Sequence, residues 1–165
     1  INMTGNRALK WVGAMRIDKD GGSLTYCVFS NNTAFACGGF FDYACLPSER
    51  YITKCVFERN NATIKGGAYC CFHMKQKINF EDCVFSMNVC ENSANSISIE
   101  TYDISVSLNY CYFSNKKEDE ITIKYEGESK VEEQYSVMFN YAQNITDKVN
   151  AIKLSVANEM PKKSI

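Results

Sequence analysis

Acidic side chains are the residues of this chain that could carry out hydrolytic or lytic chemistry. A glycoside hydrolase needs two or three carboxylates facing one groove, and a polysaccharide lyase needs a calcium-binding carboxylate cluster with a basic residue to take the proton. The candidate acids are Asp42, Asp82, Glu100 and Asp103. His73, the only histidine, is the other candidate for acid–base chemistry. What these side chains can do depends on how the fold groups them.

A sequence repeat must position them. Cysteines recur at a constant interval along the sequence, at Cys27, Cys55, Cys83 and Cys111. Two positions later the same step holds for Phe29, Phe57, Phe85 and Phe113, and Tyr141 continues it with Phe139 in the cysteine position. A third column contains Asn32, Asn60, Asn88 and Asn144 and is broken by Lys116, and an apolar column contains Leu24, Ile52, Phe80 and Leu108. A fixed period of this kind is typical of a solenoid.

The period within each copy is two, which indicates strands. In SISIE, for example, Ile97 and Ile99 lie on one face. Near Asn109 and Tyr110 the alternation shifts by one residue, so that the other set of alternate residues faces inward, which predicts a corner. We therefore predict an all-β fold: a single-stranded right-handed parallel β-helix of five to six coils with about 28 residues per coil. It should span residues 1–156, with a frayed tail at 157–165. Gly38-Gly39 and Gly66-Gly67 should lie at sharp turns, where positive φ or close approach of the next coil favours glycine.

The repeat also predicts where the candidate acids lie. A shift by one repeat places Phe41 and Tyr43 inward, in the columns of Tyr69 and Cys71, and it places Asp42 outward with Cys70 and Ser98. Asp82 aligns with Tyr26, Lys54 and Tyr110. His73 aligns with Cys45 and Thr101 at a strand end, without a neighbouring carboxylate or nucleophile. The repeat thus places no two of these carboxylates at equivalent positions of neighbouring coils, and we predict no catalytic residues.

Nine cysteines are the other chemically distinctive residues. Cys27, Cys55, Cys83 and Cys111 form an inward column, where free buried thiols pack well, although disulfides along the column are the alternative. Cys90 shares a small-residue column with Ala34 and Ala62, and Cys70 and Cys71 point to opposite faces of a strand. Since no pair of cysteines has metal-ligand spacing, we predict no metal site and no cofactor.

The repeated motifs resemble a known family. FSNN, FERN, FSMN and YAQN, followed in two copies by GGF or GGA, are similar to the FxxN and GGA[ILV] repeats of chlamydial polymorphic outer membrane proteins and of similar protist surface proteins. The resemblance covers residues 24–156 and departs from the pattern at Lys116 and at Ala94-Asn95, where GG is expected. It implies a β-helical surface protein linked to adhesion.

Composition limits the function classes further. The formal charge of −1 lacks the basic excess that phosphate backbones require, which argues against nucleic acid as a partner. No run reaches the roughly 18 apolar residues of a membrane span. Sequons at Asn2, Asn31, Asn61 and Asn144 are candidate glycosylation sites and favour an extracellular or cell-surface location.

We therefore expect a non-catalytic β-helical surface or structural protein that mediates adhesion or assembly through its strand faces and open ends. Its partner should be a protein or glycan, and its ends should continue into further coils or meet other copies in a filament, because open edges invite pairing. A polysaccharide lyase or glycoside hydrolase is one alternative. An intracellular scaffold or filament subunit in the cytoplasm, where thiols stay reduced, is the other.

Overall fold

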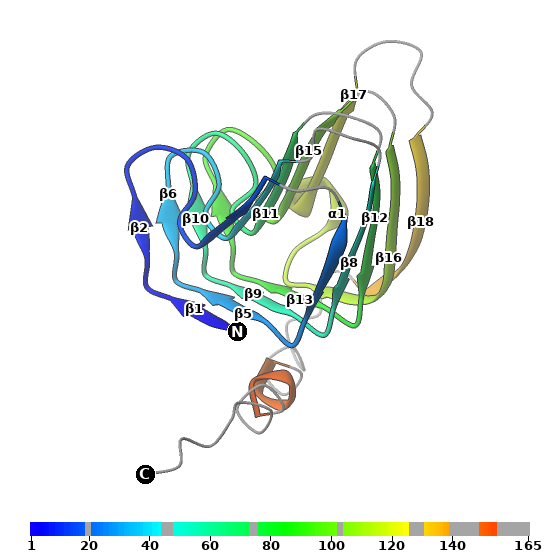
Figure 1. The fold of residues 1–165 in the computed structure, drawn as a ribbon, viewed down its shortest axis with the longest axis horizontal. Coiled ribbons are helices and arrows are strands. Elements are labelled where there is room, and N and C mark those ends of the chain that lie inside the picture. The colour runs from blue at the N-terminus through cyan, green and yellow to red at the C-terminus, as the bar shows by residue number, and fades with distance from the viewer. Residues whose placement is uncertain are drawn as a thin grey trace.

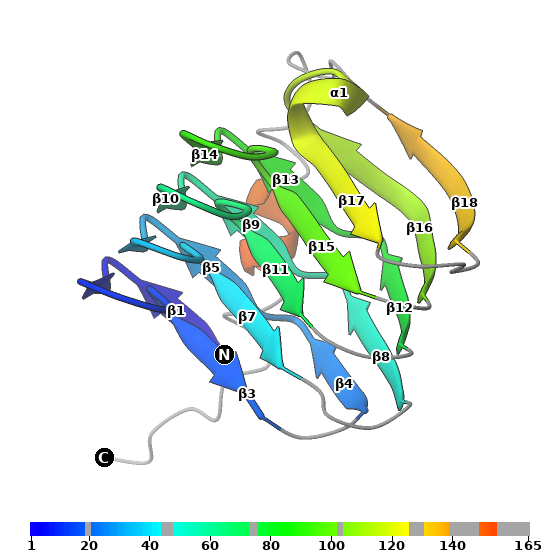
Figure 2. The same cartoon turned by 90° about the horizontal axis from the view of Figure 1, so that it is seen from above.

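A computed structural model of the chain describes residues 1–18, 21–43, 48–72, 76–101, 104–125, 131–138 and 149–154. These residues confirm the predicted parallel β-helix (Figure 1). Short strands stack from coil to coil at a spacing of about 28 residues, as the view in Figure 2 shows. The described strands make about four turns. Phe139, Tyr141 and Asn144 of the expected further copy lie outside the described residues, as does the predicted tail at 157–165.

Three sheets form the walls of the β-helix, and all their strand pairs are parallel. The first contains β1 (Asn2–Thr4), β4 (Gly22–Thr25), β5 (Val28–Ser30), β8 (Ser48–Thr53), β9 (Val56–Glu58), β12 (Gln76–Glu81), β13 (Val84–Ser86), β16 (Ile104–Phe113) and β18 (Val131–Met138). The second contains β2 (Arg7–Ala8), β6 (Thr33–Ala34), β10 (Asn61–Ala62) and β14 (Val89–Cys90). The third contains β3 (Met15–Ile17), β7 (Phe40–Tyr43), β11 (Tyr69–Phe72), β15 (Ile97–Thr101) and β17 (Ile121–Tyr125).

Stacked phenylalanines fill the interior as the sequence predicts. The ring of Phe57 lies 4.9 Å from that of Phe29 and 5.0 Å from that of Phe85, and the rings are parallel within 8° and 2°. Phe113 continues the stack at 4.7 Å from Phe85. The spacing matches the distance between neighbouring strands, so each ring contacts the coils before and after it.

Two corners per coil explain the cysteine and asparagine columns. At each corner a non-glycine residue adopts a left-handed conformation with φ between 52° and 55°; these residues are Tyr26, Lys54, Asp82 and Tyr110 at the first corner and Asn31, Arg59 and Met87 at the second. The next residue donates its backbone N–H to a side chain one coil further on. Cys27 N–H donates to Cys55 Sγ (3.4 Å), and Asn32 N–H donates to Asn60 Oδ1 (3.1 Å). Cysteine and asparagine therefore recur because each supplies a buried acceptor at a corner.

Glycines at the edge of the third sheet allow coils to approach closely. A Cβ atom at Gly38 would lie 2.4 Å from the carbonyl oxygen of Gly67, and one at Gly66 would lie 2.7 Å from that of Ser96, each in the next coil. The predicted lack of space for a side chain is thus confirmed. Positive φ is not the reason, because in the described chain it occurs among glycines only at Gly5, Gly21 and Gly22.

The register of the third sheet corrects one prediction. Tyr69 pairs with Phe40 and Cys71 pairs with Asp42, so the offset between β7 and β11 is longer than the repeat by a single position. Phe40 and Asp42 therefore face inward, while Phe41 packs with Cys70 in a separate cluster outside the main core. The physical reason is one extra residue between Ala62 and Tyr69, compared with the segment between Ala34 and Phe40. Gly38-Gly39 and Gly66-Gly67 are one repeat apart in the sequence, but the longer offset shifts them out of register with each other in the structure.

Helical structure occurs at two places in the described residues. The short helix α1 (Lys117–Glu120) lies before β17, where Lys116 interrupts the asparagine column. Residues 149–154 form a helical segment within the range expected to be β-helix, and it lies against β5, β9 and β13 (Figure 1). Its Val149 and Ile152 pack on the valine strip, an outward column formed by Val28, Val56 and Val84. The strip is buried because this segment covers it.

Candidate functional site

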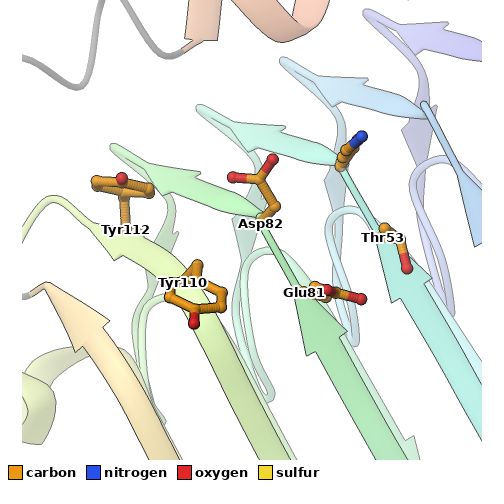
Figure 3. A pocket seen from close by; sticks show the side chains of 6 residues that line it. Thr53, Glu81, Asp82, Tyr110 and Tyr112 are labelled. Carbon is orange, nitrogen blue, oxygen red and sulfur yellow. The ribbon is translucent and has the colours of Figure 1, made fainter.

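A depression on the outer surface follows the first corner (Figure 3). It is a shallow groove of about 540 Å³ lined by Thr53, Lys54, Glu81, Asp82, Tyr110 and Tyr112. Lys54, Asp82 and Tyr110 are left-handed corner residues of successive coils, and Figure 3 shows the side chains of Asp82 and Tyr110 projecting from neighbouring coils. Thr53 and Glu81 precede them at paired positions of β8 and β12. We call this depression the corner groove.

Lys54 extends the corner column toward the first coil. Its Nζ donates to the hydroxyl of Tyr26 at 3.2 Å and lies 5.3 Å from the centroid of the Tyr26 ring. The hydrogen bond with Tyr26 raises the pKa of Lys54, which keeps the ammonium group charged at neutral pH. The predicted alignment of Asp82 with Tyr26, Lys54 and Tyr110 is thereby confirmed.

Two tyrosines supply aromatic surface at the far end of the corner groove. Tyr110 is 67 % exposed, which is unusual for so large a side chain in an ordered strand. Tyr112 is half-buried and packs beside the valine strip that the 149–154 segment covers. Tyrosine combines a flat apolar ring with a hydroxyl group, so this end can stack on a ligand and form a hydrogen bond with it.

Thr53, Glu81 and Tyr112 are the groove residues that sequence reasoning missed, because the repeat pointed to the corner column alone. The outward parity of the strand residue just before each corner could have found Thr53 and Glu81. Tyr112 lies after its corner, beside the valine strip. Two carboxyl groups, those of Glu81 and Asp82, line the same groove.

Asp42 lies inside the β-helix and not on its surface. Arg50 donates from Nε to Asp42 Oδ2 and from Nη2 to Asp42 Oδ1, both at 2.7 Å, and the Tyr69 hydroxyl donates to Oδ2 at 3.1 Å. Asp42 is completely buried and Arg50 is 2 % exposed. A carboxylate held in a buried bidentate ion pair cannot reach a ligand in an outer groove.

Glu100 lies on the outer face of the third sheet, away from the corner groove. It forms ion pairs with Lys65 and Lys124, the latter at 3.8 Å. Asp42, Asp82 and Glu100 therefore occupy three different environments. Asp103 and His73 lie outside the described residues.

Three predicted glycosylation sites are on the surface. Asn2 is exposed in β1, Asn31 is exposed at the second corner, and Asn61 is exposed in β10. These positions suit glycan attachment, which itself stays a prediction. Asn144 lies outside the described residues.

The cysteines of the described residues are free and buried, as predicted for the inward column. Burial raises the pKa of the thiols of Cys70, Cys71 and Cys83, which keeps them protonated and poorly reactive. Within the described residues, no group of three or more His, Cys, Asp or Glu side chains is arranged to hold a metal ion. The described helices include none of the length and apolarity that a membrane span requires.

Comparison with protein-family models, with curated proteins and with solved structures gives no match to this chain. The resemblance to the polymorphic outer membrane protein repeats therefore stays a prediction based on the FxxN and GG motifs.

Proposed function

We propose that the chain is a non-catalytic β-helical surface or structural protein that mediates adhesion or assembly, and that the corner groove is its main contact surface. The observation that carries the proposal is the surface column of the first corner, where aromatic, cationic and acidic side chains follow one another at the coil spacing; Tyr110 is exposed and the others are half-buried. Tyrosine-rich polar surfaces on rigid scaffolds are typical of recognition sites. The sequons and the family resemblance support a location at the cell surface.

The experiment measures binding of the labelled chain to a panel of cells and to a glycan array. Tyr110→Ala should reduce binding about tenfold or more, because a large aromatic side chain that a partner buries is a frequent hot spot. Tyr51→Ala is the matched control, since Tyr51 is 43 % exposed on the outer face of β8, outside the groove. Unchanged binding by Tyr110→Ala would contradict the role of the groove.

Treatment of the cells decides the class of the partner. Loss of binding after periodate oxidation would identify a glycan, and loss after protease treatment would identify a protein. If the chain binds neither the cells nor the glycans of the array, the adhesion part of the proposal fails.

A polysaccharide-cleaving enzyme is the second candidate, because Glu81 and Asp82 line one groove. The two carboxyl groups could serve as acid and base if a sugar chain lies across the corner. Release of reducing or unsaturated sugar ends from a panel of polysaccharides, abolished by both Glu81→Gln and Asp82→Asn, would favour this candidate over the first.

A further inference from the structure

Two tyrosines occupy equivalent positions of the corner column, and one of them carries a cation. At the start of the column, Lys54 of the following coil donates from Nζ to the Tyr26 hydroxyl at 3.2 Å and lies 5.3 Å from the centroid of the Tyr26 ring. Tyr110 stands at the same place of its corner, with a φ of 54° against 52° for Tyr26. The column itself thus shows that a corner tyrosine is a place where a cation binds.

The position that would cover Tyr110 is missing from the next strand. β18 pairs with β16, but the register skips one residue of β16 at the corner, because Asn109 and Cys111 pair with two successive residues of β18. Tyr110 therefore has no residue of β18 opposite it, whereas Tyr26 has a lysine there. Among the described residues no cation lies over the Tyr110 ring, and its side chain is exposed.

Acidic groups beside Tyr110 give this end of the corner groove a negative charge. Glu81 ends β12, the strand that pairs with β16, and Asp82 follows it, so both lie in the coil next to the Tyr110 ring (Figure 3). Glu81 is exposed and forms no ion pair with a described residue. Lys54, the basic residue of the lining, is held by the tyrosine at the start of the column. Two carboxylates and one ammonium group leave the lining with a formal charge of −1.

We propose that the corner groove binds an arginine side chain of a protein partner, with the guanidinium group stacked on the ring of Tyr110 and paired with the carboxylate of Glu81. A guanidinium group is planar, so it stacks on an aromatic ring while its N–H groups pair with a carboxylate. An acidic glycan would be repelled by the two carboxylates, and a neutral glycan would gain nothing from their charge. This inference rests on the proposed function, because it assigns the class of partner that the same groove binds.

The test uses the full chain and a fluorescent peptide of alternating glycine and arginine in anisotropy titrations at low and at physiological salt. The same peptide with citrulline in place of arginine is the matched ligand control, since citrulline has nearly the same shape but no charge. The arginine peptide should bind, and more tightly at low salt. The citrulline peptide should bind about tenfold less tightly, because it loses both the cation–π contact and the ion pair.

Variants of the chain locate the site. Tyr110→Ala should weaken binding of the arginine peptide about threefold, because the stacked ring is lost, whereas Tyr110→Phe should retain binding. Glu81→Gln should weaken binding about threefold and reduce its dependence on salt, and it decides the matter if Tyr110→Ala does not fold. Glu49→Gln is the matched control and should bind like the original chain. Glu49 is an exposed carboxylate of β8 outside the groove, and it already contacts Tyr51 and Lys77.

Each outcome decides the assignment. Tighter binding of the arginine peptide that depends on Tyr110 and Glu81 supports it. Equal binding of the two peptides, or arginine binding that Tyr110→Ala and Glu81→Gln leave unchanged, overturns it. An equal loss in Glu49→Gln would indicate general charge attraction and would overturn it as well. If Tyr110→Ala abolishes binding to cells while neither peptide binds, the groove stays the contact surface and the arginine assignment alone fails. If the arginine peptide binds the groove while no cell surface is bound, the assignment stands and the adhesion part of the proposed function fails.

Discussion

The buried ion pair between Asp42 and Arg50 offers the sharpest test of the fold, because its existence depends on a register that the plain repeat period misplaces. In Asp42→Asn the side chain keeps its shape but loses its charge, which removes the carboxylate that forms a bidentate ion pair with the buried Arg50 guanidinium. Breaking a buried pair in this way costs about 3–5 kcal/mol. The exposed pair of Arg16 and Asp18, with side chains 40 % and 57 % exposed, is the matched control. Asp18→Asn should cost less than about 1 kcal/mol.

A double variant that replaces both charged side chains tests the ion pair as a unit. Asp42 stacks on Cys71, and Arg50 stacks on Ile78, so apolar side chains fit both positions. Asp42→Val combined with Arg50→Met should be more stable than Asp42→Asn, because no charge is then desolvated. It should remain about 1–3 kcal/mol below the original chain, because the buried Tyr69 hydroxyl loses its acceptor.

Urea unfolding followed by circular dichroism and by fluorescence measures all four chains. A loss below about 0.5 kcal/mol for Asp42→Asn, the range of ordinary surface substitutions, would refute the reasoning. It would mean that Asp42 faces solvent and that the offset between β7 and β11 equals the plain repeat period after all.

Three further predictions concern other parts of the rod. Burial raises the pKa of the Glu120 carboxyl group in the folded chain. Its contribution to stability is therefore fully present below its ordinary pKa of about 4.3 and is lost as the pH rises through the pKa of the folded chain. Glu120→Gln should remove this loss of stability with rising pH, as measured by urea titrations from pH 4 to 8. Cys55→Ala removes the acceptor of the Cys27 N–H and should lower the free energy of unfolding by about 1–3 kcal/mol. Cys55→Ser keeps an acceptor and should lower it less. Equal losses for the two variants would argue against the N–H···S bond. Ile152→Asp should uncover the valine strip, lower the free energy of unfolding by about 2 kcal/mol and increase binding of a hydrophobic dye. Leu154→Asp, at a side chain that is 64 % exposed, should have none of these effects.

Strict periodicity explains how much of the fold could be predicted. Phe29, Phe57 and Phe85 occupy equivalent positions in unbroken, equal steps, so their stack follows directly from the sequence. Asp42 was misplaced because a single inserted residue changes strand parity, and two adjacent glycines look the same in either register. Nothing in the local sequence pairs Arg50 with Asp42, since that contact depends on both side chains pointing into the lumen.

Longer-range features of the surface were less predictable. The 149–154 helical segment is too short for a clear amphipathic pattern, and its partner, the valine strip, looks like ordinary outward strand residues in sequence. The corner column was predicted, whereas the groove requires knowledge of how Tyr112 and Glu81 flank it. Lys116 was recognised as a break in the asparagine column, but the buried Glu120 side chain of α1, which accepts hydrogen bonds from Ser96 and Asn115, has no signal in the repeat.

The left-handed corners have a consequence for how the surface chemistry of this rod can change. Tyr26, Lys54, Asp82 and Tyr110 share φ values of 52° to 54° although one is basic, one acidic and two aromatic. The backbone therefore does not select the side chain at this corner, even though each non-glycine residue there costs about 1 kcal/mol relative to glycine. Exchanging this single column of residues can thus change the surface chemistry of the rod while its interior stays the same.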